Sequence, residues 1–235
     1  MFKLFLVATT LVHTALSSLY SPSYQHLGRF GSSCPNDLNL TISSEIYNGN
    51  KMPFLKFEGD KPFMSYLQMT LPYEPASQVF KAINSTVGKG LLLNRGEAHI
   101  TIITPPEFDN ILKPAGVTMK EINQIAIDKD IQNSRFQVVC MGRARINQSA
   151  VSSTGASQPT VLDSYMIIVW DSHNDLRRIR EKIFSLYVSK GGERSLFDPD
   201  NFSPHITLGF NVRDLFVEDG VYKGANACIE TLTVV

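Results

Sequence analysis

From residue 63 onward, apolar and polar residues follow repeating periods that predict strands and helices in turn. Residues 63–71 are typical of a strand. Residues 73–87 place apolar side chains at helical spacing and stop at Gly88, which predicts a helix. Residues 98–104 alternate again and end at two prolines, which predicts a second strand. The first half of the chain therefore predicts the order strand, helix, strand.

The second half of the chain predicts the same order of elements. An apolar strand is expected over 165–170, a capped helix follows Ser172 and stops at Gly191, and a strand is expected over 204–210. The two copies share almost no identity, so the repeat is one of order and position. We therefore expect an α+β fold of two pseudo-symmetric lobes, each with antiparallel strands and helices, that face a central cleft.

Further segments complete the expected domain. A capping box that starts at Thr118 predicts a helix, residues 135–146 alternate as a long strand, and residues 228–235 are a candidate final strand. Residues 148–159 are rich in Ser, Thr, Gly and Gln, which is typical of a loop. Since no linker separates independent domains, residues 63–235 are expected to form a single bilobal domain.

The N-terminal residues differ in character from the rest. A lysine and an apolar run are followed by small residues, which is typical of a secretory signal peptide over residues 1–18. The alternative is a membrane anchor, but the apolar run is short for a bilayer and polar residues interrupt it. Residues 19–62 have little periodicity, so an extended lead-in is expected there. We expect a secreted or secretory-pathway protein, with no membrane attachment after cleavage.

Three sequons fit export, and the cysteines leave the disulfide pairing open. Candidate glycosylation sites are the asparagines that begin Asn-x-Ser/Thr sequons: Asn39, Asn84 and Asn147. The chain has 3 cysteines, so at least one thiol is unpaired within it, and any single pairing is open. We expect Cys34 to pair with Cys228, because both lie toward the ends of the mature chain and Cys140 shares an apolar strand face.

The charge balance limits the class of partner. Lys plus Arg number 22, and Asp plus Glu number 22. A neutral chain is a poor candidate for gripping long nucleic acids through a basic surface, because that mode needs clustered positive charge. A small anionic ligand or one nucleic-acid end needs only a local patch, so these partners stay open.

His-Ile-Thr occurs twice, once in each predicted repeat and each time on a predicted strand. Residues two apart on a strand face the same way, so each His shares a face with its Thr: His99 with Thr101, and His205 with Thr207. Imidazole can give or take a proton near neutrality, and a hydroxyl can donate to a phosphoryl oxygen. Two such strands facing each other predict acid–base hydrolysis of a phosphate ester. No cofactor is expected, and no metal, because no His/Cys/Asp cluster with metal-ligand spacing accompanies the triplets.

For either triplet alone, an ordinary half-buried strand histidine is the simpler interpretation. The recurrence in matched context favours a site. Further candidates for substrate binding are Arg143 and Arg145 on the long strand, and Tyr66 and Tyr165 on comparable strands of the two repeats. The alternatives are a solvated strand face for the arginines and core packing for the tyrosines.

The two triplets and their surroundings resemble those of the two-histidine (2H) phosphoesterase superfamily. Residues 203–210, Ser-Pro-His-Ile-Thr-Leu-Gly-Phe, are very close to that family's second motif, and residues 97–102 match its first motif more loosely. The resemblance covers about residues 63–234 and implies that the catalytic residues are His99, Thr101, His205 and Thr207. Phe210 stands where several relatives place a basic residue. It is expected on the buried face.

The resemblance implies the class of reaction. The superfamily includes 2′,3′-cyclic-nucleotide phosphodiesterases, bacterial RNA 2′,5′-ligases and RNA 3′-end-trimming exonucleases. We therefore expect a monomeric, metal-independent phosphodiesterase acting on a cyclic phosphate or an RNA-end phosphodiester, in which His205 activates water and His99 protonates the leaving oxygen. The alternatives are a non-catalytic nucleotide-binding protein of the same fold and an unrelated fold with coincidental triplets.

Overall fold

The computed structural model of the chain describes residues 39–149 and 159–235. The expected signal peptide, Cys34 and most of the expected loop lie outside these described residues. Of the helices in the described part, none has the length and apolar character needed to cross a bilayer.

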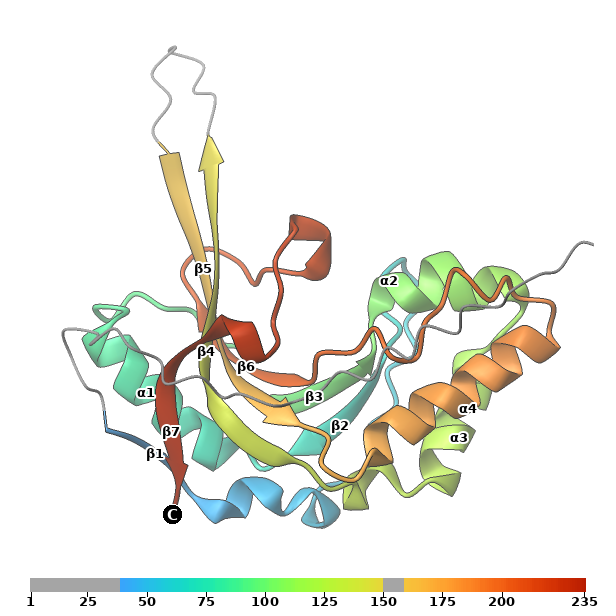
Figure 1. The fold of residues 1–235 in the computed structure, drawn as a ribbon, viewed down its shortest axis with the longest axis horizontal. Helices are drawn as coiled ribbons and strands as arrows, with labels where there is room; N and C mark the ends of the chain where they lie inside the picture. The colour runs from blue at the N-terminus through green and yellow to red at the C-terminus, as the bar shows by residue number, and fades with distance from the viewer. Residues whose placement is uncertain (1–38, 150–158) are drawn as a thin grey trace, which may run out of the picture. The chain divides into compact units, whose positions relative to one another are not determined.

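The described strands form two sheets of a mixed α+β fold (Figure 1). One sheet has five strands in the order β1-β7-β4-β5-β6, and the other pairs β2 with β3. All neighbouring strands are antiparallel except β1 and β7. The strands are β1 Leu40–Ile42, β2 Leu67–Leu71, β3 Ala98–Ile103, β4 Gln137–Ser149, β5 Pro159–Trp170, β6 His205–Phe210 and β7 Cys228–Val234.

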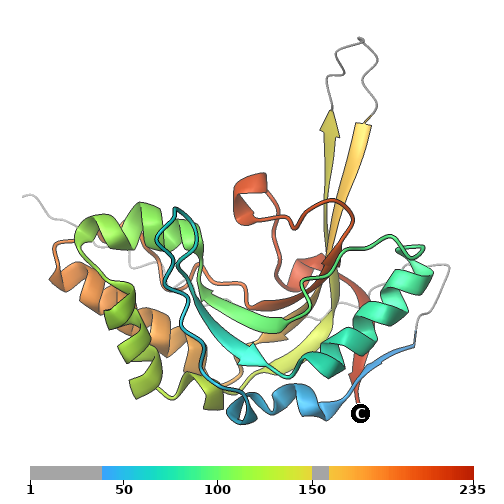
Figure 2. The same cartoon turned by 180° about the vertical axis from the view of Figure 1, so that it is seen from behind.

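Helices pack at both ends of the two sheets (Figures 1 and 2). α1 contacts β1 and β6, whereas α3 and α4 pack side by side and α4 also contacts β3. The α-helices are α1 Tyr73–Thr86, α2 Pro105–Glu107, α3 Met119–Asp128 and α4 Asp175–Ser189. Shorter turns of 3₁₀ or π-helix are η1 Ser44–Tyr47, η2 Gly49–Lys51, η3 Phe108–Leu112, η4 Lys113–Ala115, η5 Ile131–Asn133, η6 Val217–Asp219 and η7 Ala225–Ala227.

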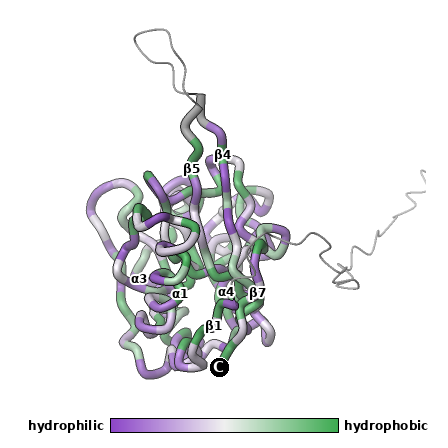
Figure 3. Tube along the Cα trace, turned by 90° about the vertical axis from the view of Figure 1, so that its left-hand side faces the viewer, coloured by the Kyte–Doolittle hydropathy of each residue, from purple (hydrophilic) through white to green (hydrophobic). Residues whose placement is uncertain are grey.

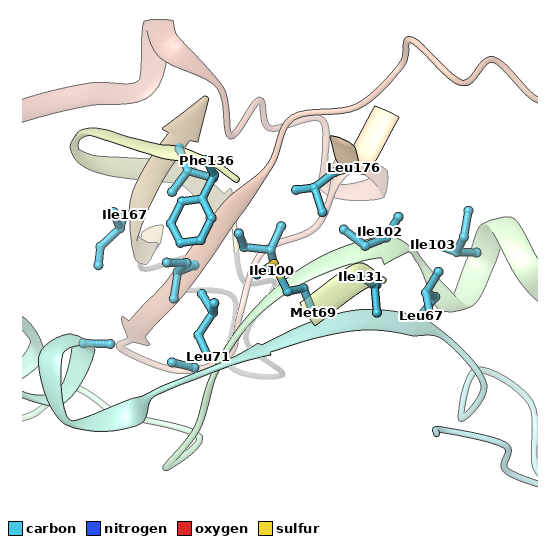
Figure 4. Packing of buried hydrophobic residues seen from close by; sticks show 14 of the residues in the cluster. Leu67, Met69, Leu71, Ile100, Ile102, Ile103, Ile131, Phe136, Ile167 and Leu176 are labelled. Atoms are coloured by element: carbon cyan, nitrogen blue, oxygen red, sulfur yellow. The ribbon is translucent and has the colours of Figure 1, made fainter. Parts of the chain in front are cut away.

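The core fixes the orientation of the strands that carry the triplets. Ile100 and Ile102 of β3 are almost fully buried, as are Ile206 and Leu208 of β6. Burying one such side chain stabilises the fold by roughly 1.5–3 kcal/mol, so a one-residue slip that exposes them is strongly disfavoured. Figure 4 shows the isoleucines of β3 beside apolar side chains of β2: Leu67, Met69 and Leu71.

The predicted order strand, helix, strand is confirmed in both halves, as β2-α1-β3 and as β5-α4-β6. The expected two pseudo-symmetric lobes are not confirmed. Among the described strands, β2 and β3 pair only with each other, whereas β5 also pairs with β4, and β4 pairs with β7. The second repeat therefore belongs to a larger sheet than the first.

Part of the expected lead-in belongs to the fold. Leu40 and Ile42 of β1 are buried, and β1 pairs in parallel with β7 at the other end of the chain. Figure 3 shows β1 beside the C-terminal end of β7. Ile46 of η1 is fully buried as well. The expectation of an extended segment over 19–62 is therefore wrong for these residues, because a three-residue strand shows little periodicity of its own.

A disulfide joins Cys140 of β4 to Cys228 of β7, with Cα atoms 5.8 Å apart. The predicted pairing of Cys34 with Cys228 is therefore wrong, and so is the interpretation of Cys140 as a buried free thiol. β7 returns antiparallel beside β4, which brings the two cysteines together across neighbouring strands. The positions of the cysteines along the chain do not reveal which strands lie side by side, so they could not predict this disulfide.

Candidate active site

The two strands that carry the triplets lie against each other. β3 contacts β6, and the segment before β3 is fastened to β6 by backbone and side-chain hydrogen bonds. The Leu93 N–H donates to the Phe210 carbonyl at 2.7 Å, and the Phe210 N–H donates back to the Leu93 carbonyl at 3.0 Å. Asn94 also donates to the Leu208 carbonyl. These bonds place residues 95–101 next to the second triplet.

The burial patterns confirm the predicted alternation within each triplet. His99 and Thr101 are partly exposed while the isoleucines between and beyond them are buried, and the same holds for His205 and Thr207 on β6. The register sets His99 opposite Thr70 on β2. Each strand therefore buries its apolar face and presents an imidazole beside a hydroxyl on the other.

The two imidazoles share one electrostatic environment. Burial lowers the pKa of His99 to about 4, with a further lowering by the charge of Arg95 and an opposing effect of Asp214. Burial also lowers the pKa of His205 to about 4, and both Lys223 and His99 act in the same direction. Because His99 acts on His205, the imidazoles lie within electrostatic reach of each other. Both rings are neutral in the free protein near neutral pH.

The two histidines have different partners at Nδ1. His205 Nδ1 lies 2.9 Å from the Ser203 carbonyl oxygen, which can only accept, so this nitrogen carries the proton and Nε2 has a free lone pair. His99 Nδ1 is buried without a hydrogen-bond partner among the described residues, and the nearest carboxylate oxygen, Glu97 Oε1, is 3.5 Å away. The site is therefore chemically asymmetric.

The carboxylate of Asp214 connects β6 with the segment that precedes β3. Its side chain is only 5% exposed. Burial raises its pKa, but the neighbouring cations and the hydroxyl of Ser164 outweigh that effect and lower it. Oδ1 accepts from Ser164 Oγ at 2.5 Å, Lys223 Nζ at 2.9 Å and the Leu215 N–H at 2.9 Å, and Oδ2 accepts from Arg95 Nη2 at 3.1 Å and Thr207 Oγ1 at 3.4 Å.

A family comparison agrees with this geometry. The family model described as "Swiss Army Knife, 2H phosphoesterase domain" matches residues 65–216, which is most of the chain and includes both triplets. The chain belongs to the 2H phosphoesterase superfamily. This family generally hydrolyses phosphodiester bonds, so its members act as phosphodiesterase-type enzymes. Comparisons with curated proteins and with solved structures gave no significant match.

In this 2H phosphoesterase, a hollow of about 500 Å³ lies near the triplets. None of the four triplet residues lines it, but two lining residues are neighbours of the triplets: Glu97 Oε1 lies 3.5 Å from His99 Nδ1, and Asp214 accepts from Thr207. Phe210 lines it and is partly exposed, so the expected placement on the buried face is wrong. A register shift at Leu208 pairs Phe210 with Ser164, two residues from the Met166 that pairs with Thr207, so Phe210 shares the face of Thr207. The lining residues are Arg95, Glu97, Phe210, Val212, Arg213, Asp214 and Phe216.

The structure does not bring Arg143, Arg145 and Tyr165 to the triplets. Arg143 pairs with Tyr165 and Arg145 with Asp163, whereas Thr207 pairs with Met166, so strand alternation sets the arginines on the opposite face of the sheet. Arg145 donates to both oxygens of Asp163, at 2.7 and 2.8 Å. Tyr165 is buried. The substrate-binding role expected for these three residues therefore lacks geometric support.

Tyr66, unlike Tyr165, lies near residues of the site. Burial raises its pKa, Glu97 raises it further, and Arg95 opposes, so Tyr66 is within electrostatic reach of two residues that line the hollow. Its ring stacks on Phe57 with centroids 4.4 Å apart. Of the two candidate tyrosines, the structure brings only Tyr66 toward the site.

Sequence reasoning missed three charged residues of the site. Arg95 could have been found from the sequence, because it is a basic residue only four positions before His99. Asp214 and Lys223 follow the second triplet in a segment without periodicity, and only the fold shows that they meet. Within the described residues, no group of three or more His, Cys, Asp or Glu side chains is arranged to hold a metal ion.

Proposed function

We propose that this protein is a metal-independent phosphodiesterase that hydrolyses a cyclic phosphate or an RNA-end phosphodiester by acid–base catalysis from His99 and His205. The observation that carries the proposal is the meeting of two His-Ile-Thr strands, with imidazoles in electrostatic reach, inside a 2H phosphoesterase domain. The hollow lined by Glu97 and Asp214, each next to one triplet, has room for a nucleotide-sized ligand.

His205 acts as the base. Its Nδ1 proton is held by the Ser203 carbonyl, so the lone pair of Nε2 is free to accept a proton. Nε2 takes a proton from water while the water oxygen bonds to phosphorus. A pKa of about 4 keeps this ring unprotonated at physiological pH, so Nε2 is available to accept a proton.

His99 acts as the acid. The bond from phosphorus to the leaving oxygen breaks, and the His99 imidazolium gives that oxygen its proton, which yields a phosphomonoester and an alcohol. Before substrate binds, burial and Arg95 hold the pKa of His99 at about 4. The negative charge of a bound phosphodiester raises it, and Glu97 lies beside Nδ1 to stabilise the imidazolium.

The threonines stabilise charge. Thr101 and Thr207 share the faces of the two imidazoles, so their hydroxyls donate to non-bridging phosphoryl oxygens as negative charge builds. Thr207 Oγ1 lies 3.4 Å from Asp214, a long hydrogen bond that competes weakly with a phosphoryl oxygen.

We also propose that the protein acts after export. The N-terminal pattern and the disulfide between Cys140 and Cys228 both fit an oxidising compartment. Asn39 and Asn147 are exposed and accessible for glycosylation. Asn84 lies within α1, and its Oδ1 accepts from the Leu92 N–H at 2.9 Å, so we expect little modification there. Mass spectrometry of the protein from a secreting cell, before and after amidase treatment, tests these sites.

Turnover of defined substrates tests the function. A panel of 2′,3′-cyclic nucleotides and short RNAs is incubated in chelator with the wild type, His205→Ala and His173→Ala. His173 is an exposed histidine on neither triplet strand and outside the lining of the hollow, and it serves as a matched control. We expect the wild type and the control to turn over, and the His205 variant to fail. Binding of nucleotide without turnover by the wild type would instead support the non-catalytic alternative.

A further inference from the structure

Two arginines line the hollow near the triplets, Arg95 and Arg213, and the fold holds them in different ways. Arg213 donates to both oxygens of Asp219, at 2.8 and 2.6 Å, and to the Asp214 carbonyl at 3.0 Å. A bidentate carboxylate neutralises a guanidinium and occupies its planar fork. Arg213 therefore has little capacity left for a ligand.

Arg95 keeps most of its donors. Among the described residues, its side chain makes one hydrogen bond, from Nη2 to Asp214 Oδ2 at 3.1 Å. A guanidinium has five N–H donors, and this side chain is 39% exposed, so donors remain that can face the hollow. Asp214 also neutralises Lys223, whose Nζ lies 2.9 Å from Oδ1, so two cations share one carboxylate.

The charge of Arg95 reaches the first triplet. Arg95 precedes His99 by four residues, and after burial it is the next largest cause of the low pKa of that imidazole. Asp214, which anchors Arg95, opposes this lowering of the His99 pKa. Glu97 also lines the hollow, and its Oε1 lies 3.5 Å from His99 Nδ1. Lys223 is a poor alternative for contacting a ligand, because its side chain is only 5% exposed.

We propose that Arg95 is the residue that binds the phosphate in this site, held by Asp214 so that its remaining N–H donors meet the non-bridging phosphoryl oxygens of a ligand in the hollow. The proposal rests on the proposed function for the nature of the ligand. A planar fork with a fixed anchor binds two phosphate oxygens at once, which a flexible lysine cannot reproduce.

Phosphate binding by matched variants tests the proposal. Inorganic phosphate is titrated into the wild type, Arg95→Met, Arg95→Lys and Arg213→Met, and the ring-proton NMR signals of the histidines report occupancy. KM and kcat for a 2′,3′-cyclic nucleotide are measured alongside. We expect Arg95→Met to weaken phosphate binding and to raise KM on the order of tenfold, the usual worth of one hydrogen bond to a charged group. Arg95→Lys should recover part of the loss, and Arg213→Met should stay within about twofold of the wild type.

The outcomes separate the two proposals. Wild-type affinity in Arg95→Met, or an equal loss in Arg213→Met, overturns the assignment of Arg95, and so does a wild type whose histidine signals do not respond to phosphate. If Arg95→Met does not fold, Arg95→Gln keeps a donor for Asp214 and must show the same loss of phosphate affinity. A wild type that binds phosphate through Arg95 but turns over no phosphodiester leaves this assignment intact and refutes the proposed enzyme.

Discussion

Replacing Asp214 with Asn tests whether this carboxylate holds the site together. The change keeps the shape of the side chain and removes its charge, which leaves Lys223 buried at 5% exposure without the carboxylate that it contacts. Removing one partner of a buried ion pair costs about 3–5 kcal/mol. The contact with Arg95, whose side chain is 39% exposed, adds no more than about 1 kcal/mol. We therefore expect the free energy of unfolding of Asp214→Asn to fall by about 3–5 kcal/mol, mostly through Lys223.

Urea unfolding near neutral pH measures this loss, and two controls separate its causes. Asp219→Asn removes a carboxylate from an ion pair with Arg213, whose side chain is 45% exposed, and should cost about 1 kcal/mol or less. The double variant Asp214→Asn with Lys223→Met should recover much of the stability, because no buried charge is left unpaired.

The loss should also depend on pH. Burial lowers the pKa of Lys223 in the wild type, although Asp214 opposes this effect. Without Asp214 the pKa falls further, so at alkaline pH the lysine becomes neutral and the cost of Asp214→Asn shrinks. A variant as stable as the wild type, or a double variant no more stable than Asp214→Asn alone, contradicts the role given to Asp214.

Three further predictions follow from the site and its frame. His99→Ala and His205→Ala should each lower turnover on the order of 10²–10⁴-fold. Thr101→Val and Thr207→Val should lower turnover less, because a hydroxyl stabilises charge but moves no proton. Steady-state kinetics on one substrate measures these differences. Reduction of the disulfide, or Cys140→Ala, should lower the free energy of unfolding by about 2–5 kcal/mol in urea titrations. The pKa of both histidines is about 4 in the folded protein, below the unfolded value, so the unfolded state binds more protons. The free energy of unfolding should therefore fall as the pH drops from about 6.5 toward 4, and His99→Gln should flatten this dependence. A pH-independent free energy of unfolding refutes the burial of these rings.

Local patterns in the sequence predicted the parts of the site that lie on regular strands. The alternation around His99 and His205 follows from the apolar residues between and beyond them, and burial of Ile100 and Ile206 enforces it. The order strand, helix, strand in each half follows from the same periodicities. These features are encoded within a few residues of each other.

Features that depend on pairing between distant segments could not be predicted from local sequence patterns. β1 is a short strand whose partner, β7, lies at the other end of the chain, and the disulfide depends on β7 lying beside β4. A register shift between β5 and β6 turned Phe210 away from its expected face. The meeting of Asp214 with Lys223 belongs to the same class, since neither residue lies on a periodic segment.

The most direct test of acid–base catalysis by the two histidines compares leaving groups. In EDTA, the wild type, His99→Ala and His205→Ala are each assayed with a cyclic nucleotide and with a phosphodiester that carries an activated leaving group such as p-nitrophenol. An activated leaving group departs without protonation, so His99→Ala should recover most of its turnover on that substrate and His205→Ala should not. Equal impairment of both variants on both substrates, or turnover that EDTA abolishes and added metal restores, would contradict the account.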